Sequence, residues 1–266
     1  MFSMKFKQKI SQKMPKIKAL IKGCVYPLLN IVSIVLKKNR CSILMYHSVS
    51  ESEALYVVRP NEFAWQMQYL KDNNFNVISL VSLVDLLMNK KEILPKTVVL
   101  TFDDGYEDNY LNVFPILKEY NFPATIFVSV DFVGDYYVSK SQNISFKMLN
   151  WEQIQEMHQS GLIDIQPHTI SHPKLAKITK EEAEREIMES KKMIDEKLNK
   201  ICRLFAYPYG SYSKETLEIL QKNNFIGAVT VKRGFVDLQD RDRLLELNRN
   251  FVYFYCSRAE FKYLAK

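Results

Sequence analysis

The sequence predicts an α/β protein in which strands and helices alternate through one domain, in the manner of a parallel barrel. Short runs rich in Val, Ile, Phe and Tyr recur from residue 42 onward, and this composition is typical of parallel strands buried on both faces. Stretches with the spacing of an amphipathic helix separate these runs. Strand–helix alternation indicates parallel βαβ units. Seven such units fit a barrel better than a short open sheet.

Each expected element rests on a local pattern. The strand-like runs lie at residues 42–46, 77–80, 98–102, 124–130, 162–166, 204–207 and 227–231. The helical stretches lie around residues 61–72, 82–89, 109–120, 151–159, 180–199 and 213–223. Asn61 is the expected N-cap of the first helix, and Thr179 with Glu182 has the spacing of a capping box.

The chain divides into a basic leader, residues 1–40, and a single domain, residues 41–266. The net charge is +7, but the first 50 residues hold ten lysines or arginines and no carboxylate. The remaining 216 residues therefore carry a net charge of about −3. An enzyme of nucleic acids would usually spread its basic residues over the binding face, so a nucleic-acid partner is not expected.

The leader alternates lysines with Phe, Ile and Leu, and an apolar run of 13 residues follows at 24–36. A membrane span needs roughly 20 apolar residues, and Pro27 and Asn30 interrupt this run. We expect the leader to lie on an anionic membrane surface, which predicts a peripheral membrane or cell-envelope protein. The alternative is a solvated leader whose apolar run packs against the domain. A signal peptide also stays open, although no small-residue cleavage site follows the run.

Two adjacent carboxylates, Asp103 and Asp104, follow the strand at 98–102, and Gly105 comes next. Neighbouring carboxylates repel each other and are costly to dehydrate. A cation bound by one of them would relieve this repulsion and keep the other ionised as a base. The alternative is an Asx turn in which Gly105 reverses the chain.

Two histidines, His168 and His172, follow the strand at 162–166 and lie between prolines. At this spacing, within one tight turn, both imidazoles can reach the same ion. Reactive groups of parallel barrels gather where strands end, which brings the histidines towards Asp104. Two His and one Asp are typical of a catalytic zinc ion with a position left for water. The sequence therefore predicts a metal-dependent hydrolase.

A third segment, FAYPYG at residues 205–210, completes a pattern of three motifs. Thr-Phe-Asp-Asp-Gly, His-Thr-x-x-His-Pro and Phe-x-x-Pro-Tyr-Gly, in this order, resemble the leading motifs of the polysaccharide deacetylase family. This family has the NodB-like domain and belongs to carbohydrate esterase family 4. The resemblance runs from about residue 42 to 252. It implies a distorted (β/α)7 barrel and hydrolysis of an acetyl group, usually an N-acetyl, from a sugar.

The resemblance also assigns roles to the motif residues. Asp103 would be the general base, and Asp104, His168 and His172 would bind a divalent metal. Zn²⁺ is the expected metal, with Co²⁺, Ni²⁺ or Mn²⁺ as alternatives. The backbone N–H of Tyr209 would hold the oxyanion, while an aromatic lining of the barrel mouth is the alternative role of this residue.

Tyr209, Trp151 and Pro208 are expected to contact the sugar, and Trp151 resembles a substrate-groove aromatic of the family. For Trp151 ordinary packing is an equal alternative. The family often has an arginine that orients the base at the position of Ala206. Arg249 is the expected substitute for this guanidinium, and a surface arginine is the alternative.

The late histidine that carries the general acid in much of the family is absent, since no histidine follows His172. The first strand, however, ends in Leu-Met-Tyr-His. This resembles the permuted branch that includes poly-N-acetylglucosamine deacetylases, in which an early histidine fills the role. His47 is therefore the predicted general acid, which protonates the departing amine. A structural histidine at a strand end is the alternative.

Together these features predict a metal-dependent deacetylase of an acetylated envelope or lipid-linked glycan. Two other functions stay open. The replaced arginine and the missing late histidine would fit a catalytically silent carbohydrate-binding domain. The same fold would also suit an amidase that acts on a small non-sugar amide.

Overall fold

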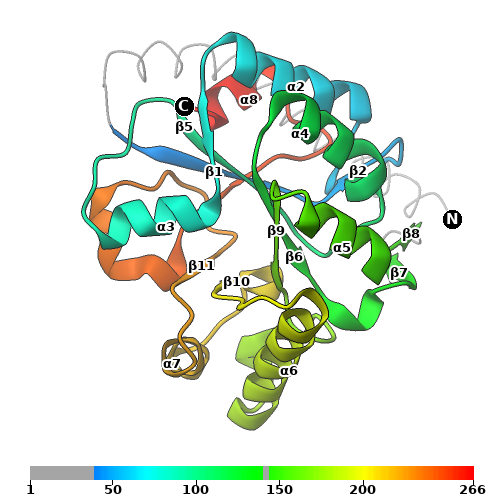
Figure 1. Ribbon diagram of the computed structural model, residues 1–266, viewed down its shortest axis with the longest axis vertical. Helices are drawn as coiled ribbons and strands as arrows, with labels where there is room; N and C mark the ends of the chain where they lie inside the picture. The colour runs from blue at the N-terminus through cyan, green and yellow to red at the C-terminus, as the bar shows by residue number, and fades with distance from the viewer. Residues whose placement is uncertain (1–38, 140–143) are drawn as a thin grey trace, which may run out of the picture.

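The computed structural model describes residues 39–139 and 144–266 (Figure 1). The predicted leader, apart from Asn39 and Arg40, lies outside the described residues, so its contact with a membrane stays a prediction. Within the two described ranges, no helix is both long and apolar enough to cross a membrane.

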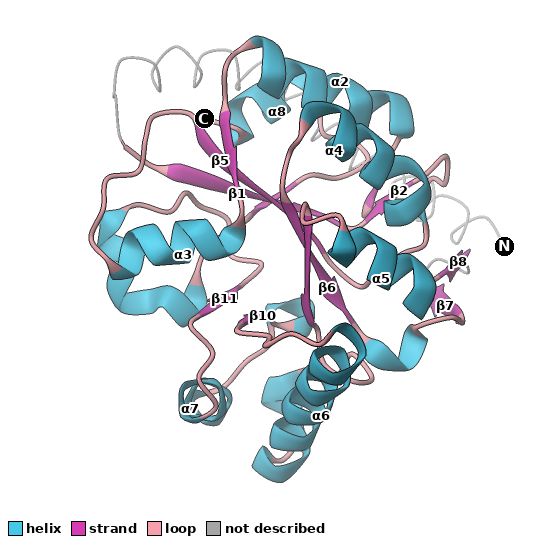
Figure 2. Cartoon of the chain, in the orientation of Figure 1, coloured by secondary structure: helices cyan, strands magenta, loops and turns pink. Residues whose placement is uncertain are grey.

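A parallel sheet forms the centre of the molecule (Figure 2). Its strands follow the order β12 (Asn250–Phe251), β1 (Cys41–Tyr46), β5 (Thr97–Phe102), β6 (Ala124–Val128) and β9 (Ile163–Pro167). β1 pairs with β5 along its whole length. The other edge of β5 is shared, since β4 (Asn76–Ile78) pairs with its first half and β6 with its second half.

Two further strands, β10 (Leu204–Ala206) and β11 (Gly227–Val229), form a separate parallel pair. Gln166 on β9 connects this pair to the sheet, because its side-chain oxygen accepts the N–H groups of Arg203 and Leu204 at 3.2 and 3.0 Å. On the other side Leu247 bridges β11 in parallel, and β12 then joins β1. The strands therefore form a ring, and the predicted fold class, a distorted α/β barrel, is confirmed.

The helices lie around the outside of the strands (Figure 1). They are α2 (Pro60–Asp72), α3 (Leu80–Met88), η1 (Asn109–Val113) with α4 (Phe114–Tyr120), α5 (Trp151–Gln159), α6 (Lys180–Leu198), α7 (Lys214–Lys222) and α8 (Arg258–Leu264). Thr179 and Glu182 form the predicted capping box. The N-cap predicted at Asn61 is wrong: α2 starts at Pro60, whose fixed φ suits the first helical position, and its N-cap is Arg59.

Several short elements had no signal in the sequence. They are the strand pair β2 (Ser48–Val49) and β3 (Val57–Val58), the hairpin of β7 (Tyr136–Ser139) and β8 (Ile144–Lys147), the 3₁₀ turns η2 (Val130–Phe132), η3 (Leu175–Lys177), η4 (Pro208–Gly210) and η5 (Leu238–Glu246), β12, and α8. Strands of two to four residues show no usable period, so only their tertiary partners define them.

Candidate metal centre and active site

The predicted site residues lie at the carboxyl ends of neighbouring strands. Asp103 and Asp104 follow β5, and His168 follows β9. Because these strands are parallel, their ends meet at one end of the barrel. Four residues there have a left-handed backbone, which is uncommon outside glycine: φ is 74° at Asp104, 70° at Thr169, 60° at His172 and 58° at Tyr209. Backbone strain of this kind concentrates at functional sites.

Asp104, His168 and His172 form a compact triad. Their ligand atoms all lie within 4.8 Å of one another. One carboxylate oxygen of Asp104 lies 3.5 Å from Nε2 of His168 and 3.2 Å from Nε2 of His172. The hydroxyl of Tyr106 donates to the other oxygen of Asp104 at 2.9 Å. The structure thus brings together the three residues that the sequence predicts as metal ligands.

The surroundings of His168 make it suitable as a metal ligand. Its Nδ1 lies 2.7 Å from the carbonyl oxygen of Ala206, which only accepts hydrogen bonds, so Nδ1 carries the proton. Nε2 is then left with its lone pair towards Asp104. Burial lowers the pKa of His168 to about 4, so the ring is neutral at physiological pH. A carboxylate and two imidazoles that converge in this way fit a divalent ion such as Zn²⁺.

Asp103 is held by an arginine and lies outside the triad. Arg249 donates to both carboxylate oxygens, from Nη1 at 2.7 Å and from Nη2 at 2.6 Å. Its Nε donates to the carbonyl oxygen of Thr230 at 2.9 Å. Arg249 is fully buried, so the alternative of a surface arginine is wrong. The guanidinium therefore contacts Asp103, as predicted. It comes from the segment before β12 and not from the position of Ala206.

His47, at the end of β1, lies close to both carboxylates. Burial opposes the ionisation of Asp103 and Asp104. Arg249 at Asp103 and His172 at Asp104 outweigh this cost, and the nearby His47 further lowers the pKa of both. Within the part of the chain that the structure describes, the buried Nδ1 of His47 has no hydrogen-bond partner.

Tyr209 lies beside the triad, with its ring centroid 4.6 Å from that of His172. Its ring is half-exposed, and its hydroxyl is hydrogen-bonded to that of Tyr137 on the β7–β8 hairpin. Pro208, directly before it, is buried, and its predicted contact with the sugar stays a prediction. Gly210 fixes this turn, because a Cβ there would lie 2.3 Å from Cγ2 of Val231.

Trp151 opens α5 and is partly buried against the main hydrophobic core. The ammonium of Lys197 lies 5.7 Å from its ring centroid. These are packing contacts, and none of them connects Trp151 to the triad. Its role as a substrate-groove aromatic stays a prediction.

Glu186 on α6 is a site residue that the sequence analysis missed. It is buried, and its Oε2 accepts the N–H groups of Ile170 and Ser171, each at 2.9 Å. Its Oε1 accepts the hydroxyl of Ser171 at 2.8 Å. Glu186 thus holds the turn between the two triad histidines. The sequence did contain a signal for this role. Glu186 lies on the helix face that buries Ala183 and Ile187, and a carboxylate is rarely buried there without a partner.

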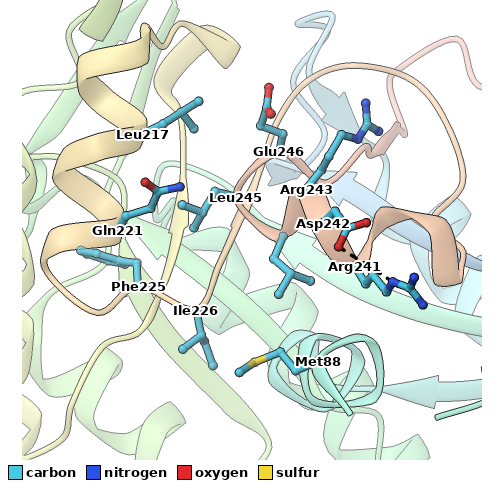
Figure 3. Close-up of a pocket in the computed structure, with 11 residues that line it drawn as sticks. Met88, Leu217, Gln221, Phe225, Ile226, Arg241, Asp242, Arg243, Leu245 and Glu246 are labelled. Atoms are coloured by element: carbon cyan, nitrogen blue, oxygen red, sulfur yellow. Dashed lines mark ion pairs between the residues drawn. The ribbon is translucent and has the colours of Figure 1, made fainter. Parts of the chain in front are cut away.

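A different pocket, shown in Figure 3, lies between the ends of α3 and α7 and the turn η5. Its volume is about 350 Å³, and its lining includes Met88, Phe225 and Arg243. No triad residue lines it. The pocket is therefore separate from the candidate metal centre.

Comparison with known proteins agrees with the motifs. A family model described as polysaccharide deacetylase matches residues 90–227, more than half of the chain. YxkH of Bacillus subtilis (strain 168), which is named for the same family, is 35% identical over 198 residues, covering 74% of this chain and 67% of that protein. A poly-β-1,6-N-acetyl-D-glucosamine N-deacetylase of Staphylococcus epidermidis is 28% identical over 223 residues and covers 75% of both chains.

Solved structures give the same result. The deacetylase PplD of Streptococcus pyogenes, in complex with acetate, is 29% identical, with a TM-score of 0.74, and the match covers 85% of this chain and 98% of that one. IcaB from Ammonifex degensii is 27% identical, also with a TM-score of 0.74, over 86% of this chain and 96% of that one. Because the segment matched by the family model contains both triad histidines and both aspartates, the chain belongs to the polysaccharide deacetylase family of hydrolases.

Proposed function

We propose that the protein is a metal-dependent deacetylase that removes N-acetyl groups from a glycan of the cell envelope or from a lipid-linked glycan. The observation that carries this proposal is the triad of Asp104, His168 and His172 beside a separate carboxylate, Asp103, held by Arg249. Relatives named as N-deacetylases of poly-β-1,6-N-acetyl-D-glucosamine, and a similar structure with bound acetate, support the class of substrate and product.

The triad would hold the metal, for which Zn²⁺ suits the donor set best. When bound, such an ion polarises a carbonyl and lowers the pKa of water. The tautomer of His168 is already set, because Ala206 accepts its Nδ1 proton. Tyr106 holds the second oxygen of Asp104, so the carboxylate presents its first oxygen to the site.

Asp103 takes the proton of the attacking water in this mechanism. Arg249 lowers the pKa of Asp103 against the opposing effect of burial, so the carboxylate is ionised at neutral pH. The two hydrogen bonds from Arg249 also fix its plane. A carboxylate that is ionised and oriented before the substrate arrives is what general base catalysis requires.

His47 and Tyr209 complete the reaction. His47 passes a proton to the nitrogen that leaves the acetyl group, and its position is supported by its effect on the pKa of both Asp103 and Asp104. The backbone N–H of Tyr209 stabilises the negative oxygen of the tetrahedral intermediate. The left-handed turn at Tyr209 and Gly210 fixes the direction of this N–H.

The test is acetate release from N-acetylglucosamine oligomers, with and without a chelator and with Zn²⁺ or Co²⁺ added back. We expect the chelator to stop release and the metal to restore it. Asp103→Asn should keep the metal but lose turnover, whereas His168→Ala should lose both. Full activity of Asp103→Asn would refute the role of the base. Metal binding without release from several acetylated glycans would favour a silent binding domain or a small-amide substrate.

A further inference from the structure

A second surface lies at the end of the barrel opposite the triad. In a parallel barrel, every strand begins at this end and every connecting helix ends there. We call it the basal face. The part of it that bears on binding comprises the α3–β5 loop at residues 89–96 with Met88 before it, the α6–β10 loop at residues 199–203, the first described residues Asn39 and Arg40, and Lys266.

The basal face exposes large apolar side chains. The exposed fractions are 51% at Met88, 57% at Leu94 and 73% at Ile201. Leu94 lies in the 89–96 loop, and Met88 directly precedes this loop. Scattered exposed apolar residues are normal, but several that share a face with basic residues are typical of an interaction site.

Basic residues surround these apolar side chains. Lys90 and Lys91 are exposed, and among the described residues neither forms an ion pair. Burial lowers the pKa of Lys266, and the positive charges of Lys262 and Lys96 lower it further. The ammonium groups of Lys262 and Lys96 therefore lie close enough to Lys266 to repel it.

The described chain also begins at this face. The side-chain amide of Asn39 donates to the carboxylate of Glu92 at 2.5 Å, and Glu92 is the one acid of the 89–96 loop. Nε of Arg40 donates to the carbonyl oxygen of Lys266 at 3.3 Å. Residues 1–38, which contain nine lysines and no carboxylate, therefore join the domain at the basal face.

We propose that the basal face docks onto an anionic lipid bilayer. Lys90, Lys91 and Lys96 would lie among the headgroups, and Met88, Leu94 and Ile201 would reach the boundary of the acyl chains. The charge of the face and the position where the leader joins it both favour a bilayer over another partner. This docking turns the triad away from the lipid, towards a glycan that extends from the membrane. The inference does not depend on the proposed catalytic activity.

The test is binding of the full-length chain to vesicles, measured by co-sedimentation. Vesicles of phosphatidylcholine with phosphatidylserine are compared with vesicles of phosphatidylcholine alone. The double variant Lys90→Glu/Lys91→Glu should bind the anionic vesicles more weakly by roughly tenfold or more, since each lysine near the surface contributes to binding. Leu94→Ser should weaken binding to a smaller extent. The matched control is Lys177→Glu/Lys214→Glu, at the triad end of the barrel, which should bind like the unmodified chain.

Circular dichroism checks that each variant is folded. Acetate release from a soluble oligomer, if present, should be the same for all of them. Equal binding by the Lys90→Glu/Lys91→Glu variant and the unmodified chain would overturn the proposal and leave the leader as the sole attachment. Equal weakening by the control variant would also overturn it, because binding would then follow total charge and not this face.

Discussion

Among single residues, the pair of Asp103 and Arg249 combines burial, charge and two short hydrogen bonds. Lysine at position 249 would keep the charge, but its one ammonium cannot reproduce the planar fork that contacts both oxygens. We expect Arg249→Lys to lower kcat/KM about 10- to 100-fold, or roughly 1.4–2.8 kcal/mol of transition-state stabilisation. Metal content should not change, because the hydrogen bonds of Arg249 go to Thr230, Thr101 and Asp103 and not to the triad. Steady-state kinetics and metal analysis test this. The exposed Arg241→Lys is the control, and unchanged kcat/KM in Arg249→Lys would contradict the orienting role.

A second residue, Asp108, gives a prediction for stability against pH. Burial raises its pKa from an ordinary 3.8 to about 6, although Ser48 and the N–H of Val49 donate to its carboxylate. The folded chain therefore binds more protons than the unfolded chain between about pH 4 and 6. The contribution of Asp108 to the free energy of unfolding falls as the pH rises through this window.

Asn at position 108 cannot ionise, so Asp108→Asn should gain stability relative to the unmodified protein as the pH rises from 4 to 7. The change in this difference over this pH range should be roughly 2 kcal/mol, because the unfolded chain is already partly ionised at pH 4. Urea unfolding at several pH values measures it, with the exposed Asp85→Asn as the control. A difference that stays constant with pH would show that Asp108 ionises without cost in the folded protein.

Among the elements, α6 positions the turn that contains both triad histidines. Glu186→Ala would leave the buried N–H of Ile170 without its acceptor, at about 1–3 kcal/mol, and would also remove the acceptor of the part-buried N–H of Ser171. We expect the turn to loosen and the metal affinity to fall roughly tenfold, as is usual when supporting partners of a metal site are removed. Glu186→Gln keeps one acceptor oxygen, so its metal affinity should lie between that of the unmodified protein and that of Glu186→Ala.

Titration with a competing chelator measures this affinity. Glu189→Ala is the control, because Glu189 is exposed and lies on the same helix. If Glu186→Ala bound metal as tightly as Glu189→Ala, the turn would be fixed by the strands alone. A loss of stability without a loss of affinity would give the same conclusion.

For the whole molecule, the sequence predicts the central strands and the triad, but it does not by itself predict how the barrel closes. The strands at 98–102 and 162–166 were predictable because they are continuous apolar runs, and the triad followed from the rule that parallel strands end together. The position of Arg249 was predictable only through the family pattern. No local period marks residues 247–251, since they become a strand only by filling the gap between β11 and β1.

The barrel is also closed between β9 and β10. Side-chain hydrogen bonds connect these two strands there, in place of a ladder of backbone hydrogen bonds. Gln166 accepts two N–H groups of the β10 segment, and two residues further on His168 donates to the carbonyl oxygen of Ala206. These side-chain hydrogen bonds therefore close the barrel and set the tautomer of a metal ligand. A polar residue within an apolar strand could not be assigned this role before its partners were known.

Gln166→Met would fill a similar volume but remove the acceptor, which leaves the buried N–H of Leu204 and the part-buried N–H of Arg203 without their partner. The free energy of unfolding should fall by roughly 2–5 kcal/mol, and Gln155→Met on the exposed face of α5 should change it by less than about 0.5 kcal/mol. Because the closure between β9 and β10 also supports His168, metal affinity should fall about tenfold in Gln166→Met alone. Urea unfolding and chelator competition measure the two effects. Loss of stability with unchanged metal affinity would show that the contact between His168 and Ala206 holds without Gln166, and unchanged stability would mean that the helices alone keep the barrel closed.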